Sequence, residues 1–543
     1  MRALVALTAA ITVVVGIGAP AQAAPTARSV GDAKDPGGLF TKNVCHDTKI
    51  AKVLTGAQPG DMLADPQNVT DESNSDYGSI YRVLYATEGA NNTLEASCGL
   101  IAIPEAATLK GVVAWAHGTI GLLQRCQPSE RPQNFVGKMP GGIGVPSKGL
   151  DQSAGALENI LRDGFAVVAT DYASQGIGNN GLQHYVLGVP EGLAVLNSAR
   201  VLTHNPVAFG LSAIDANAQL PLVTWGHSQG GGSAIWAGQL AKQYFELRAD
   251  HTLNLAGIAA EAPATQYTTS PGQPANLIGA HLGDRDMYNF DPGLGVKIPI
   301  GAVLFSYVMA SWSQVTNANA GILPFGPTLN VNYEDVLTFA GENTAPKVSA
   351  NCLSGTDLLN ILGETKSYQY PALYKFFAQP FAGGKVNGTW TGAIDTTCNN
   401  PGKYKVAVQD WCRWLQFNMP GPYGVNDYAK YPLNNAGAKV PMYLAQGRDD
   451  QIMWCVDASG AVSAPNCLTA QYYGSIDDSY CASKNYVNAQ YFANVGHMQV
   501  PSAAATNPNT GKYQNSPLDN FITGAMNGSL PGTCSVTNSP DPN

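Results

Sequence analysis

The chain is 543 residues long, with 45% hydrophobic and only 13% charged residues and a formal net charge of −9. This acidic balance, without a dense Lys/Arg run, argues against a nucleic acid or an anionic membrane surface as the partner. The length exceeds what one small core needs, so we expect one large domain with insertions, or two domains.

The N-terminus has the pattern of a secretory signal peptide. Arg2 gives a short positive region, an apolar run follows, and AQA at residues 21–23 fits the small-residue cleavage rule. A membrane anchor is the alternative, but the run ends at Pro20, short of a full membrane span. We therefore expect a signal peptide over residues 1–23, cleaved near Ala23, and an exported, extracellular protein.

The ten cysteines agree with export. Their number is even, and none forms a C-x-x-C pair with the spacing of zinc ligands. Disulfides are therefore expected rather than a metal or redox site. The sequence alone leaves their pairing open.

After an N-terminal extension over residues 24–76, strands and helices alternate. Strands are expected at residues 77–87, 98–104, 111–118, 165–171, 221–226 and 255–263, and helices at residues 153–164, 190–202 and 228–245. Most of these strands are apolar on both faces, which is typical of strands inside a sheet that helices cover on both sides. Residues 77–265 are thus predicted to form the first part of an α/β core with a mostly parallel sheet.

The alternation lapses over residues 266–438. Helical stretches at 300–312 and 370–381, separated by Gly, Pro and Asn, predict a large helical insertion that caps the sheet. The core is expected to resume over residues 439–530, with strands at 439–447 and 488–496 and a helix at 517–526. The tail, residues 531–543, is expected to be irregular, with Cys534 as a candidate anchor.

Residues 225–232, WGHSQGGG, place a serine between glycines at the junction of a predicted strand and a predicted helix. This is the setting of a G-x-S-x-G nucleophile elbow, whose turn is too tight for side chains at positions 226 and 230. The Ser228 hydroxyl would then stand at the positive end of the helix. A glycine-rich turn without chemistry is the alternative, but the strand-to-helix placement favours the elbow.

A serine hydroxyl needs a base to become a nucleophile, and the base needs an orienting acid. In elbow-bearing folds the order along the chain is serine, acid, histidine. Of the histidines after Ser228, His251 lies in a predicted helix-to-strand loop and His281 in the insertion, whereas His497 follows the last predicted core strand. His497 is therefore the predicted base.

The acid is expected directly after the preceding strand. Asp449 and Asp450 stand there, whereas Asp477 and Asp478 lie farther from any strand end. The Asp449–Asp450 pair could also be an ordinary polar turn.

The oxyanion of an acyl-transfer intermediate needs two hydrogen-bond donors. The backbone N–H of Gln229, which follows the serine, is one candidate. The other is the backbone N–H of Thr119, because WAHGTIG places this residue just after a buried strand. A simple strand-ending turn is the alternative at this position.

Two further patterns resemble ligand sites but are weak. Residues 176–181 match G-x-G-x-x-G, yet they open no helix and have no acidic residue about twenty positions on, so a dinucleotide site is not expected. The cluster of Asp284, Asp286, Asn289 and Asp291 offers oxygen ligands to calcium, but without EF-hand spacing a solvated loop is favoured. We expect no cofactor and no metal.

Short motifs follow one another along the chain in the order WAHGT, ATDY, WGHSQGG, AAEAP, GRDD and VGH, between about Tyr77 and Met498. This combination resembles the secretory lipase family, the lipase-A type branch of the α/β-hydrolases. The resemblance implies an α/β-hydrolase fold with a helical cap inserted after the sixth strand, and hydrolysis of carboxylic esters.

The resemblance also implies roles for individual residues. Carried over position by position, Ser228 is the nucleophile, Asp450 the acid and His497 the base. Asp450 is preferred over Asp449 because the run G-x-x-D-x-x-apolar, beginning at Gly447, matches the acid loop of the resembling lipases.

The sequence thus predicts a secreted serine hydrolase of carboxylic esters, a lipase or esterase that requires no cofactor. Two alternatives stay open: a secreted serine peptidase on the same fold, and a non-catalytic binding protein with a hydrolase fold. The expected partner is a small-molecule or lipid ester. Transient contact with a lipid interface is open, and no nucleic acid or obligate protein partner is expected.

Aromatic residues in the predicted cap leave the acyl preference open. They either line an apolar acyl site or form the core of the cap, and they include Trp312, Phe376, Phe377, Trp411 and Trp414.

Overall fold

A computed structural model of the chain places residues 39–543 in one unit. It describes residues 43–46, 54–73, 78–90, 94–105, 108–133, 156–175, 181–268, 289–290, 297–315, 323, 326–327, 331–369, 372–382, 384–386, 389–391, 393–453, 472, 480–481 and 486–539. The predicted signal peptide lies outside the described residues. Among the described residues, no helix combines the length and apolarity that crossing a membrane requires.

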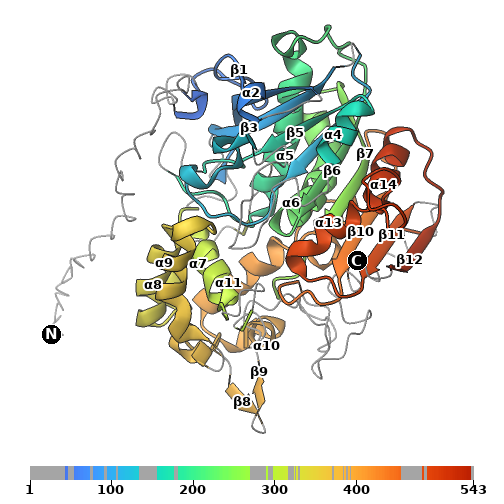
Figure 1. The fold of residues 1–543 in the computed structure, drawn as a ribbon. Coiled ribbons are helices and arrows are strands. Elements are labelled where there is room, and N and C mark those ends of the chain that lie inside the picture. Colours follow the sequence, from blue (N-terminus) through green and yellow to red (C-terminus); the bar gives the residue numbers. More distant parts are fainter. Residues whose placement is uncertain are drawn as a thin grey trace, which may run out of the picture. The chain divides into compact units, whose positions relative to one another are not determined.

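A ten-stranded sheet forms the centre of the fold, in the order β1-β2-β3-β5-β4-β6-β7-β10-β11-β12 (Figure 1). Its strands are β1 (Gln67–Asn68), β2 (Gly78–Glu88), β3 (Leu94–Pro104), β4 (Gly111–Ala116), β5 (Phe165–Thr170), β6 (Leu220–His227), β7 (Leu253–Glu261), β10 (Met442–Gly447), β11 (Val487–Phe492) and β12 (Cys534–Ser539). The pairs from β1 to β5 are antiparallel, and every pair from β5 to β12 is parallel. The prediction of a mostly parallel sheet is confirmed.

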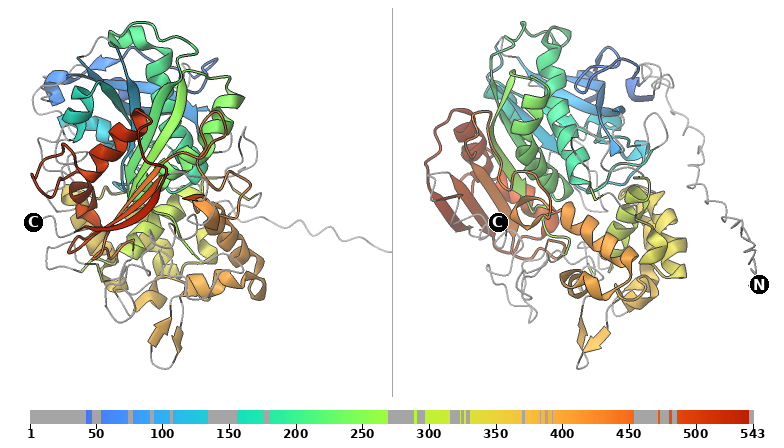
Figure 2. Two further views of the ribbon diagram at one scale, coloured as in Figure 1. Left: turned by 90° about the vertical axis from the view of Figure 1, so that its right-hand side faces the viewer. Right: turned by 180° about the vertical axis from the view of Figure 1, so that it is seen from behind.

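Helices cover both faces of this sheet, which explains the apolar strands. The helices are α2 (Thr70–Ser73), α4 (Ala156–Arg162), α5 (Gly188–His204), α6 (Gln229–Leu247), α7 (Ile300–Trp312), α8 (Phe339–Ser349), α9 (Gly355–Thr365), α10 (Ala393–Asn399), α11 (Val406–Phe417), α13 (Val500–Ala504) and α14 (Pro517–Met526). α4 and α14 pack on one face, and α5 and α6 pack on the other (Figure 2). Every residue of β4 and β5 is therefore buried.

The chain between β7 and β10 adds no described strand to the large sheet. It carries α7 to α11 and a two-stranded hairpin of β8 (Gly384–Val386) and β9 (Thr389–Thr391), at one end of the sheet (Figures 1 and 2). The bounds 266–438 for a separate cap stay a prediction. The helix predicted over 300–312 is α7.

The prediction of a helix over residues 370–381 is wrong. Its described part holds only a short 3-10 turn at Ala372–Lys375. The following residues run alongside the chain before α8 instead, where Leu337 and Phe377 form an antiparallel bridge. Pro380 has no N–H to donate, so a regular helix is disfavoured there.

The cap aromatics form a buried core. Trp312 stacks on Trp411 with ring centroids 5.9 Å apart, and Trp414 lies 5.6 Å from Trp312. Phe377 meets the Phe305 ring edge-on at 4.7 Å. These side chains are at most 1% exposed, so they fill the cap itself.

The last strand corrects the expectation of an irregular tail. β12 (Cys534–Ser539) extends the sheet by pairing in parallel with β11. A disulfide from Cys534 to Cys481 anchors its first residue, as the sequence suggested. Strand pairing and the bridge together make this segment the sheet's edge.

Four disulfides join the eight described cysteines: Cys45–Cys98, Cys126–Cys352, Cys398–Cys412 and Cys481–Cys534. Cys455 and Cys467 lie outside the described residues. The paired thiols fit the oxidising, extracellular setting expected of the chain.

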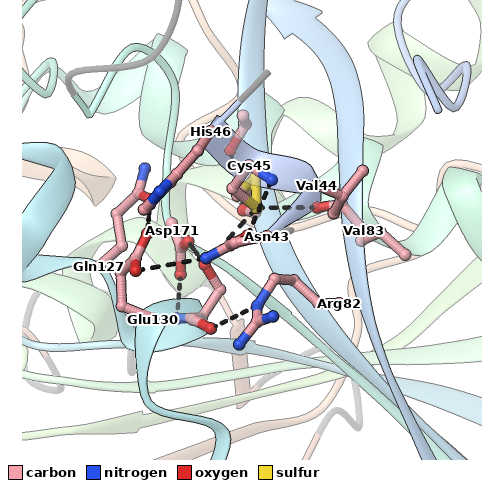
Figure 3. Close-up of a disulfide and its surroundings, with 12 residues drawn as sticks. Asn43, Val44, Cys45, His46, Arg82, Val83, Gln127, Glu130 and Asp171 are labelled. Carbon is pink, nitrogen blue, oxygen red and sulfur yellow. Dashed lines mark hydrogen bonds and ion pairs between the residues drawn. A yellow bond between two sulfur atoms is a disulfide. The ribbon is translucent and has the colours of Figure 1, made fainter. Parts of the chain in front are cut away.

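The first disulfide lies beside a polar cluster near the antiparallel edge of the sheet (Figure 3). Arg82 Nε donates to the Ser129 carbonyl over 2.8 Å, and the Ser129 N–H donates to Asp171 over 3.1 Å. Burial raises the pKa of Asp171 to about 7, although the Ser129 bonds oppose this. This cluster joins β2, β5 and the loop after β4.

Candidate active site

Ser228 has the backbone strain that an elbow requires. It lies between the end of β6 and the start of α6, with φ 58° and ψ −120°. A Cβ at Gly226 would lie 2.3 Å from the Gly230 carbonyl oxygen, and one at Gly230 would lie 1.9 Å from that of Ala116. Only glycine fits at either position, so both glycines are required for the tight turn that carries Ser228.

His497 reaches Ser228 from the loop after β11, which lies three strands along the sheet from β6. It begins a 3-10 turn, His497–Gln499, shortly after β11. Its Nε2 lies 2.8 Å from the Ser228 Oγ, and its Nδ1 lies 2.8 Å from an Asp450 carboxylate oxygen. The tautomer with its proton on Nδ1 satisfies both contacts, because Nδ1 then donates to Asp450 and Nε2 accepts from the serine hydroxyl.

Asp450 is fully buried and meets only donors. One oxygen accepts from the N–H groups of Ile452 and Met453, at 2.8 and 2.7 Å, and the other accepts from Gln446 Nε2 at 2.7 Å and from His497. Burial opposes ionisation, but His497 and these hydrogen bonds outweigh it and hold the pKa of Asp450 below its usual value. Asp450 is thus held as a carboxylate facing the imidazole.

The neighbouring acid is placed differently. The Asp449 side chain is exposed, and the backbone N–H of this residue donates to the Val495 carbonyl over 3.0 Å. His251 lies exposed between α6 and β7. The histidine of the predicted insertion, His281, and the acids Asp477 and Asp478 lie outside the described residues.

The two candidate oxyanion donors flank the elbow. Gln229 is the first residue of α6, so its N–H has no partner within the helix. The chain before Thr119 passes close to the serine, because a Cβ at Gly118 would lie 3.5 Å from the Ser228 Cβ. The Thr119 hydroxyl is 2.9 Å from the Tyr185 hydroxyl, so this side chain is engaged with the loop before α5.

The loop that carries Thr119 is tied to the cap. The Leu353 N–H donates to the Ile120 carbonyl over 2.9 Å, and the Cys126–Cys352 disulfide follows a few residues later. Arg125 adds a 3.0 Å ion pair with Asp357. The loop that carries Thr119 is therefore held against the cap.

Two residues next to the elbow were missed by sequence reasoning. His227 Nε2 lies 2.9 Å from the His497 carbonyl oxygen, and the two rings are 4.7 Å apart. Burial, and then the nearby His497, lower the pKa of His227 to about 3, so it packs as a neutral ring. Glu191 is the second; its only sequence signal is a lone acid within an apolar helix.

No group of His, Cys, Asp or Glu in the described part of the chain could hold a metal ion. Ser228, His497 and Asp450 bring a strained serine, an imidazole and a buried carboxylate into hydrogen-bonded sequence. Chemically, such a set can pass a proton from the hydroxyl to the imidazole while the carboxylate stabilises the imidazolium.

Residues 151–271 match the secretory lipase family model. The predicted resemblance to that family is confirmed over this segment, which includes Ser228 and Gln229 but ends before Asp450 and His497. At this general level the match supports a carboxylic ester hydrolase of lipase type. A comparison with curated protein sequences found no match.

Solved structures show the fold. Candida antarctica lipase A in its closed state has a TM-score of 0.51 at 14% identity, with 89% of this chain and 85% of that chain covered. A second structure of Candida antarctica lipase A gives 0.50 at 14% identity, covering 89% and 86%. The rice cell wall degrading esterase LipA from Xanthomonas oryzae gives 0.47 at 16% identity, covering 87% and 97%. The likeness to lipase A confirms the predicted α/β-hydrolase fold.

Proposed function

We propose that this protein is a secreted serine hydrolase that cleaves carboxylic esters through an acyl-enzyme on Ser228. The observation that carries the proposal is the relay of two 2.8 Å contacts from Ser228 through His497 to Asp450. The strained elbow supports it further, because such strain is stored where it serves a function. The family match over residues 151–271 agrees with ester chemistry.

The first half-reaction transfers the acyl group to the protein. His497 Nε2 takes the Ser228 proton while Oγ attacks the ester carbonyl, and Asp450 stabilises the imidazolium. The negative charge moves to the carbonyl oxygen, where the N–H groups of Thr119 and Gln229 would receive it. As the tetrahedral intermediate collapses, His497 gives its proton to the departing alkoxide, and an alcohol leaves.

The second half-reaction restores the protein. His497 takes a proton from a water molecule, whose oxygen attacks the acyl carbon. Collapse of the new intermediate returns the proton to the Ser228 Oγ and releases the carboxylic acid. No cofactor takes part in this sequence.

Export is part of the proposal. The N-terminal pattern of a signal peptide and the four described disulfides support a protein that is secreted and then works in an oxidising medium. The expected substrate is a small-molecule or lipid ester that reaches the serine beneath the cap.

A substrate series tests the proposal. Para-nitrophenyl esters from acetate to palmitate and emulsified triacylglycerols are compared as substrates of wild type and of Ser228→Ala. The variant should lose about a million-fold in turnover. Ser306→Ala is the matched control, because this buried hydroxyl only donates to Ala302 within α7. A Ser228→Ala protein with a tenth of wild-type activity, or faster cleavage of aminoacyl amides than of esters, would contradict the proposal.

A further inference from the structure

Glu191 is a buried carboxyl that joins two helices behind the elbow. It lies in the first turn of α5 and is 2% exposed. One oxygen accepts from the Val186 N–H over 2.7 Å and from Gln229 Nε2 over 2.6 Å. The other oxygen is 2.7 Å from the Ser233 hydroxyl. Two of its partners thus lie at the start of α6, the helix that follows Ser228.

The Glu191 carboxyl binds the strained backbone at Val186 as well as side chains of α6. Val186 has φ 47°, a conformation that a β-branched residue adopts only when its surroundings hold it. Its N–H is one of the donors to Glu191. The neighbouring Tyr185 hydroxyl contacts the Thr119 side chain over 2.9 Å. Glu191 therefore connects the segments that carry both candidate oxyanion donors.

The hydroxyl of Ser233 makes the network depend on protonation. It lies 2.7 Å from Glu191 and 2.9 Å from the Gln229 carbonyl oxygen, and it has a single hydrogen. With Glu191 ionised, Ser233 donates to the carboxylate. With Glu191 protonated, the acid donates to Ser233, which then donates to the Gln229 carbonyl. Of the two arrangements, the protonated one gives Glu191, Ser233 and the Gln229 carbonyl a partner each without a buried charge.

The groups that face Glu191 do not supply a counter-charge. Burial and the nearby Glu191 raise the pKa of Tyr172, Tyr185 and Tyr267, so these phenols stay neutral near it, and α6 contributes Gln229 and Ser233. Burial raises the pKa of Glu191 to about 8, against the lowering by its three hydrogen-bond donors. The neutral acid is therefore the resting form at neutral pH.

We propose that Glu191 is a positioning residue for ester hydrolysis: as a neutral acid bonded to Gln229 and Ser233, it holds the first turn of α6 so that the Gln229 N–H meets the oxyanion. The inference rests on the proposed function of Ser228. Ionisation of Glu191 puts a buried negative charge beside the place where the oxyanion develops, and it takes the Ser233 donor away from the Gln229 carbonyl. Both changes slow the acylation step.

The test is a pH profile of kcat and KM, from about pH 6 to about pH 10, on para-nitrophenyl butyrate. Wild type should lose kcat on the alkaline side as Glu191 ionises. Glu191→Gln keeps the shape, accepts at one end and donates to Ser233 at the other, so it should retain kcat within about twofold at neutral pH and lose the alkaline fall. Glu191→Ala should lower kcat by about tenfold to a hundredfold with KM nearly unchanged, less than the loss of a whole oxyanion donor.

Glu261→Gln is the matched control. Burial also raises the pKa of the Glu261 side chain to about 8, but that side chain lies against Trp225 instead of Gln229. It should keep the wild-type alkaline fall. If wild type cleaves the ester and Ser228→Ala does not, while Glu191→Gln retains the wild-type profile, the role of Glu191 is refuted and the proposed function stands. An inactive wild type, or an active Ser228→Ala, refutes both. Glu191→Gln carries the test even if the alanine variant does not fold.

Discussion

Replacing Asp450 by asparagine isolates the part that its charge plays. The carboxylate faces four donors: two backbone N–H groups, Gln446 Nε2 and His497 Nδ1. An asparagine side chain keeps the shape but offers a single acceptor oxygen. At one of the two places where Asp450 has an oxygen, the amide nitrogen must therefore face hydrogen-bond donors.

The costs at the two positions differ. If the amide nitrogen faced the two backbone N–H groups, both would lose their acceptor inside the protein, at about 1–3 kcal/mol each. The amide oxygen therefore stays there, and the nitrogen faces His497 and Gln446. The His497 Nδ1 must then accept, which moves the imidazole proton to Nε2. An Nε2–H cannot take the proton of Ser228.

The expected loss in kcat is about ten-thousand-fold, the size seen when a buried acid of this kind is replaced by its amide. That corresponds to about 5.4 kcal/mol of transition-state stabilisation. Asp449→Asn is the matched control, because Asp449 is exposed and its backbone bond to Val495 survives. Removing this screened charge should change kcat by less than about tenfold.

Both variants should be assayed on one soluble ester, with circular dichroism to confirm that they fold. We expect Asp450→Asn to be nearly inactive toward the ester and Asp449→Asn to remain active. The reverse pattern would show that the exposed acid orients the base. Two active variants would mean that no carboxylate is needed, which would refute the tautomer argument.

Three further predictions concern a glycine, a buried acid and two disulfides. Gly230→Ala should give no soluble, active protein, since its Cβ would meet a β4 carbonyl at 1.9 Å; expression yield and ester turnover check this. Burial raises the pKa of Glu261 from 4.5 to about 8, so its contribution to stability is complete below pH 4.5 and is lost as the pH rises through about 8. Glu261→Gln should therefore flatten the fall in Tm from acidic to alkaline pH. An unchanged slope of Tm against pH would count against this assignment. Replacing both cysteines of Cys126–Cys352 by serine should cost about 5 kcal/mol, and replacing those of Cys398–Cys412 about 3 kcal/mol, because the bridges close loops of 226 and 14 residues; in urea unfolding, equal losses would contradict the loop-length argument.

Much of the core could be predicted because each element shows its environment locally. The run FAVVAT at residues 165–170 is apolar at nearly every position, and it forms β5, which is buried on both faces. The tight turn at Ser228 could be predicted from the sequence for a similar reason. Gly226 and Gly230 are required by contacts within a few ångströms of the turn itself, so the constraint is visible in the sequence.

Elements held by distant contacts could not be predicted this way. β12 reads CSVTNS, has no apolar alternation and lies at the sheet's edge, where one side of the strand has no neighbour among the described strands. Its order comes from β11 and from the bridge between Cys481 and Cys534. Neither partner is adjacent in sequence, so the tail looked irregular.

The site shows the same division. Residue type alone leaves Asp449 and Asp450 equivalent, and the resemblance of the run beginning at Gly447 favoured Asp450. The turn after β10 buries Asp450 and exposes Asp449. Glu191 lies 38 residues before Gln229, with which it shares a hydrogen bond. Its position on an apolar helix marks it as unusual, but its partner is set by the packing of α5 on α6.

The proposed function requires that Ser228 is an activated nucleophile. The most direct measurement is intact-protein and peptide mass spectrometry after treatment with a fluorophosphonate, which reacts only with an activated serine. We expect one adduct per chain, located on Ser228, that appears in step with the loss of ester turnover and is absent from Ser228→Ala. An unlabelled protein that still hydrolyses esters, or an adduct on another serine, would contradict it.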